Sequence, residues 1–404
     1  MRTPSKSARG FSMIELMVAM VIGLIGMIII LQVFEVSEGI KRTTTSGGDA
    51  QQNGAIATYV LERDIRNSGA GFNDTPWAGC SMVGWDSTLT PSDFPAAGAI
   101  MLLTPVRIIS GTTSTTPDEI IIAYGSQPQA GNGSSLSTTM AASTDPLRVS
   151  SVYGYNPGDL VVVMESPPPL PALPKPCSIM EITRVVGDSL FHDNGSYTYT
   201  PPGGSATNVP SRFNKPGGLG NVYVGGPGAT QKTMVYNVGT YKPGPTLFVY
   251  SDYKIANSTL TVTSAFTVGT VPAIADNIVH MRALYGIDDG SNNGTVTTNA
   301  AYAAGDGVVD SWIDGTATPN WSLVIAVRIA IVARSALKEK SSQGVAGPCD
   351  ATQAEPAWTG TAWSGTPLNL KTRLDLTTDP DWQCYRYRVF EATIPVRNWV
   401  WSSS

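Results

Sequence analysis

The stretch Gly10-Phe11-Ser12-Met13-Ile14-Glu15-Leu16 opens the segment that decides the fold. From Phe11 to Phe34 there are 24 residues, and Glu15 is the only ionisable side chain among them. As a helix this segment is roughly 36 Å long, which is enough to cross a hydrocarbon core of about 30 Å. The ten preceding residues hold three basic side chains and no acid. The positive-inside rule therefore predicts a cytoplasmic N-terminus and delivers the rest of the chain to the periplasm.

Two ordinary explanations account for part of this pattern. A cleaved secretory signal has an apolar core of about 7–15 residues and a small-residue cleavage site. Here the apolar run is longer, and no such site follows it. An uncleaved signal anchor explains the length and the orientation, but it leaves Glu15 without a reason, because a carboxylate inside a membrane helix is costly and tends to be functional.

The residues themselves resemble the N-terminal signal of type IV prepilins and pseudopilins. The shared features are a basic leader, Gly10, Phe11, a glutamate at the fifth position after the glycine and an unbroken apolar helix. The resemblance implies that a prepilin peptidase cleaves between Gly10 and Phe11 on the cytoplasmic side. It also implies that the new N-terminal residue, Phe11, is N-methylated.

The same resemblance gives Glu15 a role in assembly. Cleavage leaves a cationic amine on Phe11, and methylation keeps that charge. An unpaired charge is strongly penalised inside an apolar helix bundle, so a Glu15 carboxylate paired with an amine selects the register at which a subunit enters a filament.

Composition predicts a secreted, β-rich domain after the helix. The chain has 404 residues, of which only 14% are charged, and it contains 41 Gly and 29 Pro. Without the leader, 23 basic residues face 31 acidic ones, a formal net charge of −8. The sequence contains no basic patch of the kind that would predict nucleic-acid binding. We expect an α+β fold, with a leader at 1–10, a long helix at 11–67 whose residues 11–34 span the membrane, and a globular domain at 68–404 packed as an antiparallel sheet on the helix.

The four cysteines predict disulfides, because the periplasm is oxidising and the chain has no C-x-x-C pair and only two histidines. Three pairings are possible. Proximity in the sequence favours Cys80 with Cys177 and Cys349 with Cys384.

Apolar periodicity carries the helix beyond the membrane to about residue 67, where Gly69 and Gly71 give a stop signal. The stretch from Thr43 to Gly54 is rich in Gly and Thr, so a bend is expected there. Strand patterns follow at 101–103, 119–124, 159–164, 246–250, 259–263, 278–287, 321–332 and 385–396, with Pro-rich and Gly-rich loops at 167–176 and 203–228. On the strand at 278–287, Val279, Met281, Ala283, Tyr285 and Ile287 share one face, and His280 and Arg282 lie on the polar one.

Four later segments extend the resemblance to the PilW-type minor pilins: 61–66, 285–288, 327–334 and 388–398. The resemblance implies a minor pilin of a type IV pilus that belongs to the tip complex and initiates assembly. It implies other minor pilins, the major pilin, a large tip adhesin and prepilin peptidase as partners. The expected location is the inner membrane before assembly and the pilus tip afterwards.

No enzyme and no cofactor are predicted. His192 lies in a loop and His280 on a strand, and neither has a nucleophile motif beside it. Asp288, Asp289, Asp306 and Asp310 lie in Gly-rich and Asn-rich loops and could bind one Ca²⁺, although such residues also form ordinary solvated turns.

Two other functions stay open. A minor pseudopilin of a type II secretion system shares the helix and the signal, but its globular domain is usually much smaller. A membrane-anchored periplasmic binding protein would use the loops between Gly71 and Pro272 to hold a ligand, and it would lack cleavage after Gly10.

Overall fold

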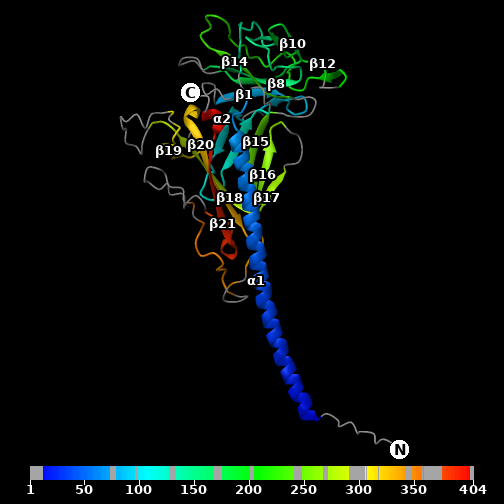
Figure 1. The fold of residues 1–404 in the computed structure, drawn as a ribbon, viewed down its shortest axis with the longest axis vertical. Helices are drawn as coiled ribbons and strands as arrows, with labels where there is room; N and C mark the ends of the chain where they lie inside the picture. Colours follow the sequence, from blue (N-terminus) through cyan, green and yellow to red (C-terminus); the bar gives the residue numbers. More distant parts are fainter. Residues whose placement is uncertain are drawn as a thin grey trace, which may run out of the picture.

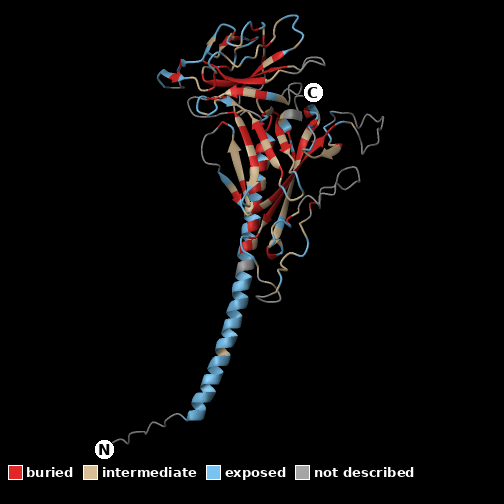
Figure 2. Cartoon of the chain, turned by 180° about the vertical axis from the view of Figure 1, so that it is seen from behind, coloured by how far each residue is buried: buried red, intermediate tan, exposed pale blue. Residues whose placement is uncertain are grey.

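The computed structural model describes residues 12–400 except 73–78, 96–98, 127–132, 167–174, 201–203, 241–247, 267–271, 291–304, 306, 317, 340, 342–346, 357 and 359–374. One helix, α1 (Met13–Asn67), runs unbroken for 55 residues and projects far out of the β-rich part (Figure 1). It ends where the sequence predicts, before Gly69, whose φ of 78° is the left-handed conformation that favours glycine. The predicted bend is a gentle curve, because the helix stays hydrogen-bonded through residues 43–54 (Figure 2).

The upper half of α1 lies against two antiparallel sheets (Figure 1). The four-stranded sheet has the order β19-β18-β20-β21, and the five-stranded sheet has the order β17-β16-β15-β5-β4. Contacts from α1 go mainly to β21, β20 and β17. The bounds are β4 (Val106–Ile109), β5 (Glu119–Tyr124), β15 (Val249–Ala256), β16 (Thr259–Ser264), β17 (Ala273–Asp276), β18 (Ile278–Ile287), β19 (Ser311–Ile313), β20 (Val324–Arg334) and β21 (Tyr387–Pro395).

A seven-stranded sheet begins a distal lobe, which we define as the described parts of residues 79–103 and 133–240. It lies at the end of the molecule opposite the N-terminus of α1 (Figure 1). Its strands pair antiparallel except β1 with β9, which are parallel. The bounds are β1 (Cys80–Trp85), β2 (Asp93–Phe94), β3 (Leu102–Leu103), β6 (Ser134–Ser135), β8 (Asp159–Glu165), β9 (Cys177–Glu181) and β14 (Thr233–Thr240).

Two small sheets complete the distal lobe. Short helical segments, η3, η5 and α2, lie in the C-terminal third of the chain. The predicted loop at 203–228 contains one strand of the small sheets, and most of the predicted Pro-rich loop at 167–176 lies outside the described residues. The bounds are β7 (Leu147–Arg148), β10 (Arg184–Val186), β11 (Ser189–Phe191), β12 (Ser196–Tyr199), β13 (Thr207–Pro210), η3 (Trp321–Leu323), η5 (Trp382–Cys384) and α2 (Arg397–Val400).

The seven-stranded sheet separates two hydrophobic cores, which is why every residue of β8 is buried. Val162 and Met164 face the main core, which also takes in α1 and both antiparallel sheets. Val161 and Val163 face a second core that belongs to the distal lobe alone. A strand buried on both faces loses the polar and apolar alternation of a half-exposed one, and the apolar run at 160–164 shows this.

The strand at 278–287 departs from the prediction in two ways. A register shift between Ile278 and His280 places Val279 with a third cluster on the outer face, away from Met281, Ala283, Tyr285 and Ile287. The predicted polar face is buried as well, because His280 and Arg282 are each only 1% exposed. The cover comes from distant segments, including the turn at 113–118, so the strand's own pattern could not reveal it.

Candidate assembly site on the N-terminal helix

The first turn of α1 is closed by Glu15. Its carboxylate accepts a hydrogen bond from the Ser12 backbone N–H at 2.9 Å, and the Ser12 hydroxyl accepts one from the Ile14 N–H at 3.3 Å. This reciprocal capping box satisfies two N–H groups that a helix start leaves unpaired. Gly10 and Phe11 lie outside the described residues, so cleavage and methylation there stay predictions.

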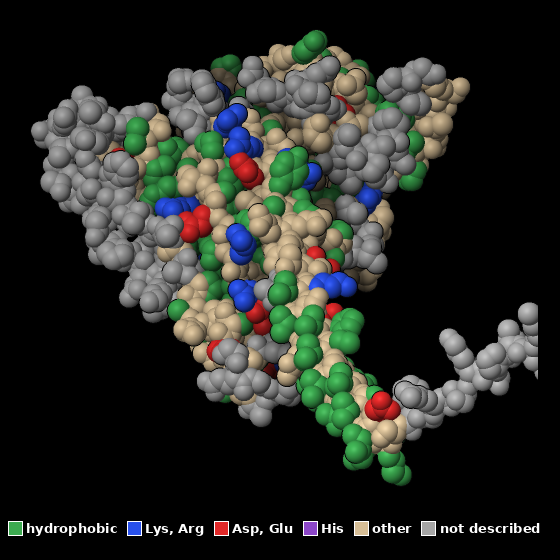
Figure 3. All heavy atoms as spheres, turned by 60° about the horizontal axis from the view of Figure 1, so that its bottom comes forward, with side chains coloured by type: hydrophobic (Ala, Val, Ile, Leu, Met, Phe, Trp, Pro, Cys, Tyr) green, Lys and Arg blue, Asp and Glu red, His purple; other side chains and the backbone are tan. Residues whose placement is uncertain are grey.

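The lower half of α1 presents a continuous apolar surface. Every large hydrophobic side chain from Met13 to Ile40 is more than half exposed. Figure 3 shows hydrophobic side chains covering the projecting helix. Of the described helices, α1 is the one long and apolar enough to cross a membrane, and none of its most apolar window is buried in the protein. Such a surface needs cover from lipid or from other helices.

The upper half of α1 is buried along one face, at a spacing of three and four residues. Ala57, Leu61 and Ile65 are fully buried. Gly54 lets the Phe390 ring of β21 lie directly on the helix backbone, because a Cβ added at Gly54 would be 2.0 Å from Phe390 Cε2. One helix therefore has two halves with opposite tasks, the upper fixed to its own domain and the lower left uncovered.

A buried polar contact fixes this docking. Asp64 is 3% exposed, and its carboxylate accepts hydrogen bonds from the Tyr253 hydroxyl of β15 and from Arg63 Nε. Burial, and next the hydrogen bond to Asp64, raises the pKa of Tyr253 well above its usual value. Burial and the Asp64 charge raise the pKa of Tyr124 to about 12. Both phenols are therefore neutral donors at physiological pH, as a buried carboxylate requires.

The C-terminus of α1 is capped from the other end of the chain. The Asn398 amide, in α2, lies within 3.2–3.4 Å of the carbonyl oxygens of Arg66, Asn67 and Ser68 and donates to them. These carbonyls are among the last of the helix, which lack partners within it. Asp64 and Asn398 lie in two of the segments that carry the family resemblance, 61–66 and 388–398, but the sequence did not assign either residue this contact.

Both disulfides form as predicted, Cys80 with Cys177 and Cys349 with Cys384. The first joins β1 to β9 at the base of the distal lobe, with a Cα–Cα distance of 5.8 Å. The second has a Cα–Cα distance of 4.7 Å and ties residue 349 to the η5 turn just before β21.

Both histidines are at least partly buried and contact backbone carbonyl groups. His192 is within 2.9 Å of the Asp145 carbonyl oxygen, and burial lowers its pKa. His280 lies beside Arg282, whose guanidinium pairs with the buried Asp118 at 2.5 Å. Asp118 also accepts hydrogen bonds from the Gly111 and Ala283 N–H groups. Neither histidine contacts a nucleophile in any described hydrogen bond.

Two of the predicted calcium ligands, Asp288 and Asp310, hydrogen-bond the two loops to each other. Asp288 accepts hydrogen bonds from the N–H groups of Gly305 and Gly307, and Asp310 accepts from those of Asp289 and Gly290. These bonds fit the role of Asp as a turn former. Asp306 lies outside the described residues, and within the described ones no group of three or more potential ligands gathers. The calcium site stays a prediction.

Two family models match the chain. Residues 235–398 match Type IV Pilus-assembly protein W, and residues 5–31 match the Prokaryotic N-terminal methylation motif. No curated protein and no solved structure matches it significantly. The first match runs from β14 into α2, so it takes in the four-stranded sheet and strands β15 to β17 of the five-stranded one, while β4 and β5 lie outside it. The second covers the predicted cleavage site, Glu15 and most of the apolar helix. Residues 32–234, which include the upper half of α1 and most of the distal lobe, lie outside both.

Proposed function

We propose, from the premise that this chain is a PilW-type minor pilin of the type IV pilus system, that it is a structural subunit of the tip complex that initiates pilus assembly. The observation that carries the proposal is the division of α1 into a lower half with an exposed apolar surface and an upper half fixed to the globular domain. A subunit built this way is held in the bilayer before assembly and is packed by neighbouring helices afterwards.

Insertion depends on charge at the start of the helix. We infer that prepilin peptidase removes residues 1–10 and leaves a methylated cationic amine on Phe11. In the uncleaved chain the Glu15 carboxylate holds the Ser12 N–H, one residue away from that future amine. After cleavage the same carboxylate is free to pair with its own amine or with that of a subunit already in the filament. Pairing removes the penalty of a lone charge in an apolar bundle.

The distal lobe is our candidate for the surface that binds other pilus components. It has its own core and lies at the end of the molecule away from the membrane helix (Figure 1). Most of it also lies outside the residues that match the family model, so we expect features specific to this chain to lie there. Other minor pilins, the major pilin and a large tip adhesin are the proposed partners.

Orientation and location belong to the same proposal. Before assembly the N-terminus lies in the cytoplasm and the β-rich domain in the periplasm, with α1 crossing the inner membrane. The disulfides support a periplasmic domain, because they persist in oxidising compartments. The matched families are structural pilus components, which supports a structural role over catalysis.

Processing, piliation and location test the proposal together. Immunoblots of strains with and without prepilin peptidase should show a product about ten residues shorter only in the first, and mass spectrometry should find methylated Phe11. Deletion of the gene should reduce surface pili, and immunogold should label pilus tips. An intact start at Met1, or normal piliation without the gene, would contradict it. Dependence of a type II secretion substrate on this chain would favour a pseudopilin.

A further inference from the structure

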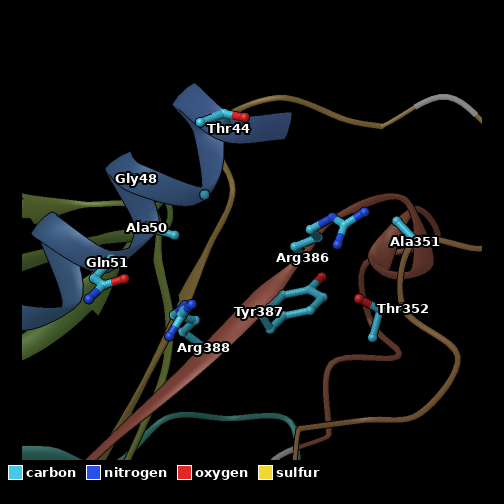
Figure 4. Close-up of a pocket in the computed structure, with 10 residues that line it drawn as sticks. Thr44, Gly48, Ala50, Gln51, Ala351, Thr352, Arg386, Tyr387 and Arg388 are labelled. Atoms are coloured by element: carbon cyan, nitrogen blue, oxygen red, sulfur yellow. The ribbon is translucent and has the colours of Figure 1, made fainter. Parts of the chain in front are cut away.

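A groove opens where α1 leaves the globular domain. It has a volume of about 720 Å³ and lies between α1 and the start of β21 (Figure 4). The helix side offers Thr44, Gly47, Gly48 and Gln51, and the strand side offers Arg386 and Arg388. Among the described residues that line it, none is acidic. We call it the basic groove.

Alternation along β21 produces this groove. Phe390 packs on Gly54, and Arg388 and Arg386 follow at alternate positions on the same face as the strand diverges from the helix. Arg386 pairs with Glu339 at 2.5 Å. Arg388 is exposed, and in the part of the chain that the structure describes it has no ion-pair partner. Beside Gly47 and Gly48 no atom lies within 4 Å of where a Cβ would be, so another backbone can approach closely.

The helix face that lines the basic groove continues down α1 as an apolar stripe. Residues 44, 47, 48 and 51 follow the helical spacing of one face, and the same face carries Ile29, Val33, Val36 and Ile40 around a second, shallow hollow. A partner that fits this face is therefore a helix with acidic side chains opposite the basic groove and apolar side chains opposite the apolar stripe, nearer the N-terminus.

The opposite flank of the same helix has that character. At 100° per residue, Glu35 and Glu38 lie about 180° around α1 from the groove-lining face, and Leu24, Ile28 and Leu31 lie below them on the acidic flank. Both glutamates are exposed. Within one molecule the two flanks cannot meet, because they face opposite directions on one continuous helix.

We propose that the basic groove binds the Glu35–Glu38 turn of a second copy of this chain, displaced upwards along the helix axis. Phe390 lies over Gly54, and two strand residues span about 7 Å, so Arg388 is level with the turn at residues 48–51. Shifting the second copy by thirteen residues, about 20 Å along the helix axis, brings its Glu35 and Glu38 to that level. The apolar residues that precede them in the second copy then lie beside the apolar stripe of the first. Because the two surfaces differ, the contact between the two copies is head-to-tail.

This inference rests on the proposed role as a pilus subunit, and crosslinking between two tagged copies in cells with the pilus machinery tests it. Thr44→Cys on one copy and Leu31→Cys on the other become neighbours at the proposed shift, and both charged groups stay intact. Thr45→Cys paired with Leu31→Cys is the matched control, since residue 45 points 100° away. We expect efficient disulfide crosslinking for the first pair and little for the second.

Charge reversal then tests the chemistry. R388E on the groove copy should lower the crosslink yield at least about fivefold, as should E35K/E38K on the other copy, and the two reversals together should restore it. R148E, an exposed arginine on the distal lobe, should have no effect. Equal yields at residues 44 and 45, no effect of R388E, or a loss that E35K/E38K fails to restore would each overturn the proposal. The last outcome would indicate another anion, such as a lipid phosphate.

Leader removal separates the two proposals. Crosslinking is scored only on chains that have lost residues 1–10 by immunoblot. A processed chain that does not crosslink contradicts the groove assignment alone. An unprocessed chain in every strain contradicts the proposed function.

Discussion

The Glu15 carboxylate accepts a hydrogen bond from the Ser12 N–H, and in the proposed maturation it pairs with a cationic amine after cleavage. Its charge and its hydrogen bond can be separated by mutation. Glu15→Gln keeps an acceptor for the Ser12 N–H but removes the charge. We expect normal leader removal and a several-fold loss of the protein from sheared pili, measured by immunoblot of pilus and membrane fractions. Ser12→Ala, which removes the bond to the Ile14 N–H, is the control and should assemble normally. Wild-type incorporation of Glu15→Gln would show that helix capping, not charge, is what assembly needs.

His280 makes the domain sensitive to acid. Burial, and next the positive charge of Arg282, lowers the pKa of His280 to about 4. An unfolded histidine titrates near 6.5, so the folded state disfavours the proton, and stability falls as the pH drops from about 6.5 towards 4. The full effect is about 3 kcal/mol. Urea unfolding of the detergent-solubilised chain at pH 7 and pH 4.5 measures it.

The matching variant is His280→Gln, which has no titrating group in this range. It should be less stable than the natural chain at pH 7, because the imidazole donates to the Ser114 carbonyl. Its stability should nonetheless change much less between the two pH values. An unchanged pH dependence would assign the acid sensitivity to other groups, such as His192, whose pKa is also lowered.

Between elements, the closest approach of α1 to the sheet is at Gly54, and substitution there should weaken the docking. Gly54→Ala places a Cβ against the Phe390 ring, and we expect a loss of about 1–3 kcal/mol in the free energy of unfolding. Gly47→Ala meets nothing within 4 Å and should gain up to about 1 kcal/mol, because alanine favours helix. Thermal unfolding followed by circular dichroism compares them. A stabilised Gly54→Ala would mean that Phe390 moves aside at little cost.

Gly54 also shows which parts of an element the sequence predicts. Its propensity indicated a weak helix, yet the glycine is needed because an aromatic ring from a strand more than 300 residues later lies on it. The helix bounds were predictable, since a capping pattern and terminal glycines are local signals. Val279 and the burial of His280 and Arg282 were not, because a bulge and covering segments from elsewhere in the chain decide them.

At the scale of the whole molecule, the two disulfides should be separable by the parts that they stabilise. Cys80–Cys177 closes a sequence separation of 97 residues and Cys349–Cys384 one of 35, which by loop entropy corresponds to about 4–5 and 3–4 kcal/mol. Cys80→Ser/Cys177→Ser should loosen the distal lobe, and Cys349→Ser/Cys384→Ser should loosen the segment before β21. Amide hydrogen exchange measures this, and each double variant should show faster exchange in its own region. A uniform change over the whole chain would contradict this division.

The overall architecture of the molecule could be predicted from its sequence, whereas its surface features could not. The apolar helix and the β-rich domain each leave a compositional signal, and the cysteines were close enough in sequence for their pairing to be favoured correctly. The basic groove left none, because it exists only where α1 and β21 diverge. Its two arginines read as ordinary strand residues until the strand's place beside the helix is known.

The docking of α1 on β21 also fixes an order of events in biogenesis. The rod leaves the ribosome first, but its main support and its terminal amide cap are supplied by residues 387–398. In the proposed topology, the apolar half of α1 enters the bilayer before its upper half gains a permanent surface to pack on. We therefore expect that upper half to be most open to proteolysis until the last strand has been exported.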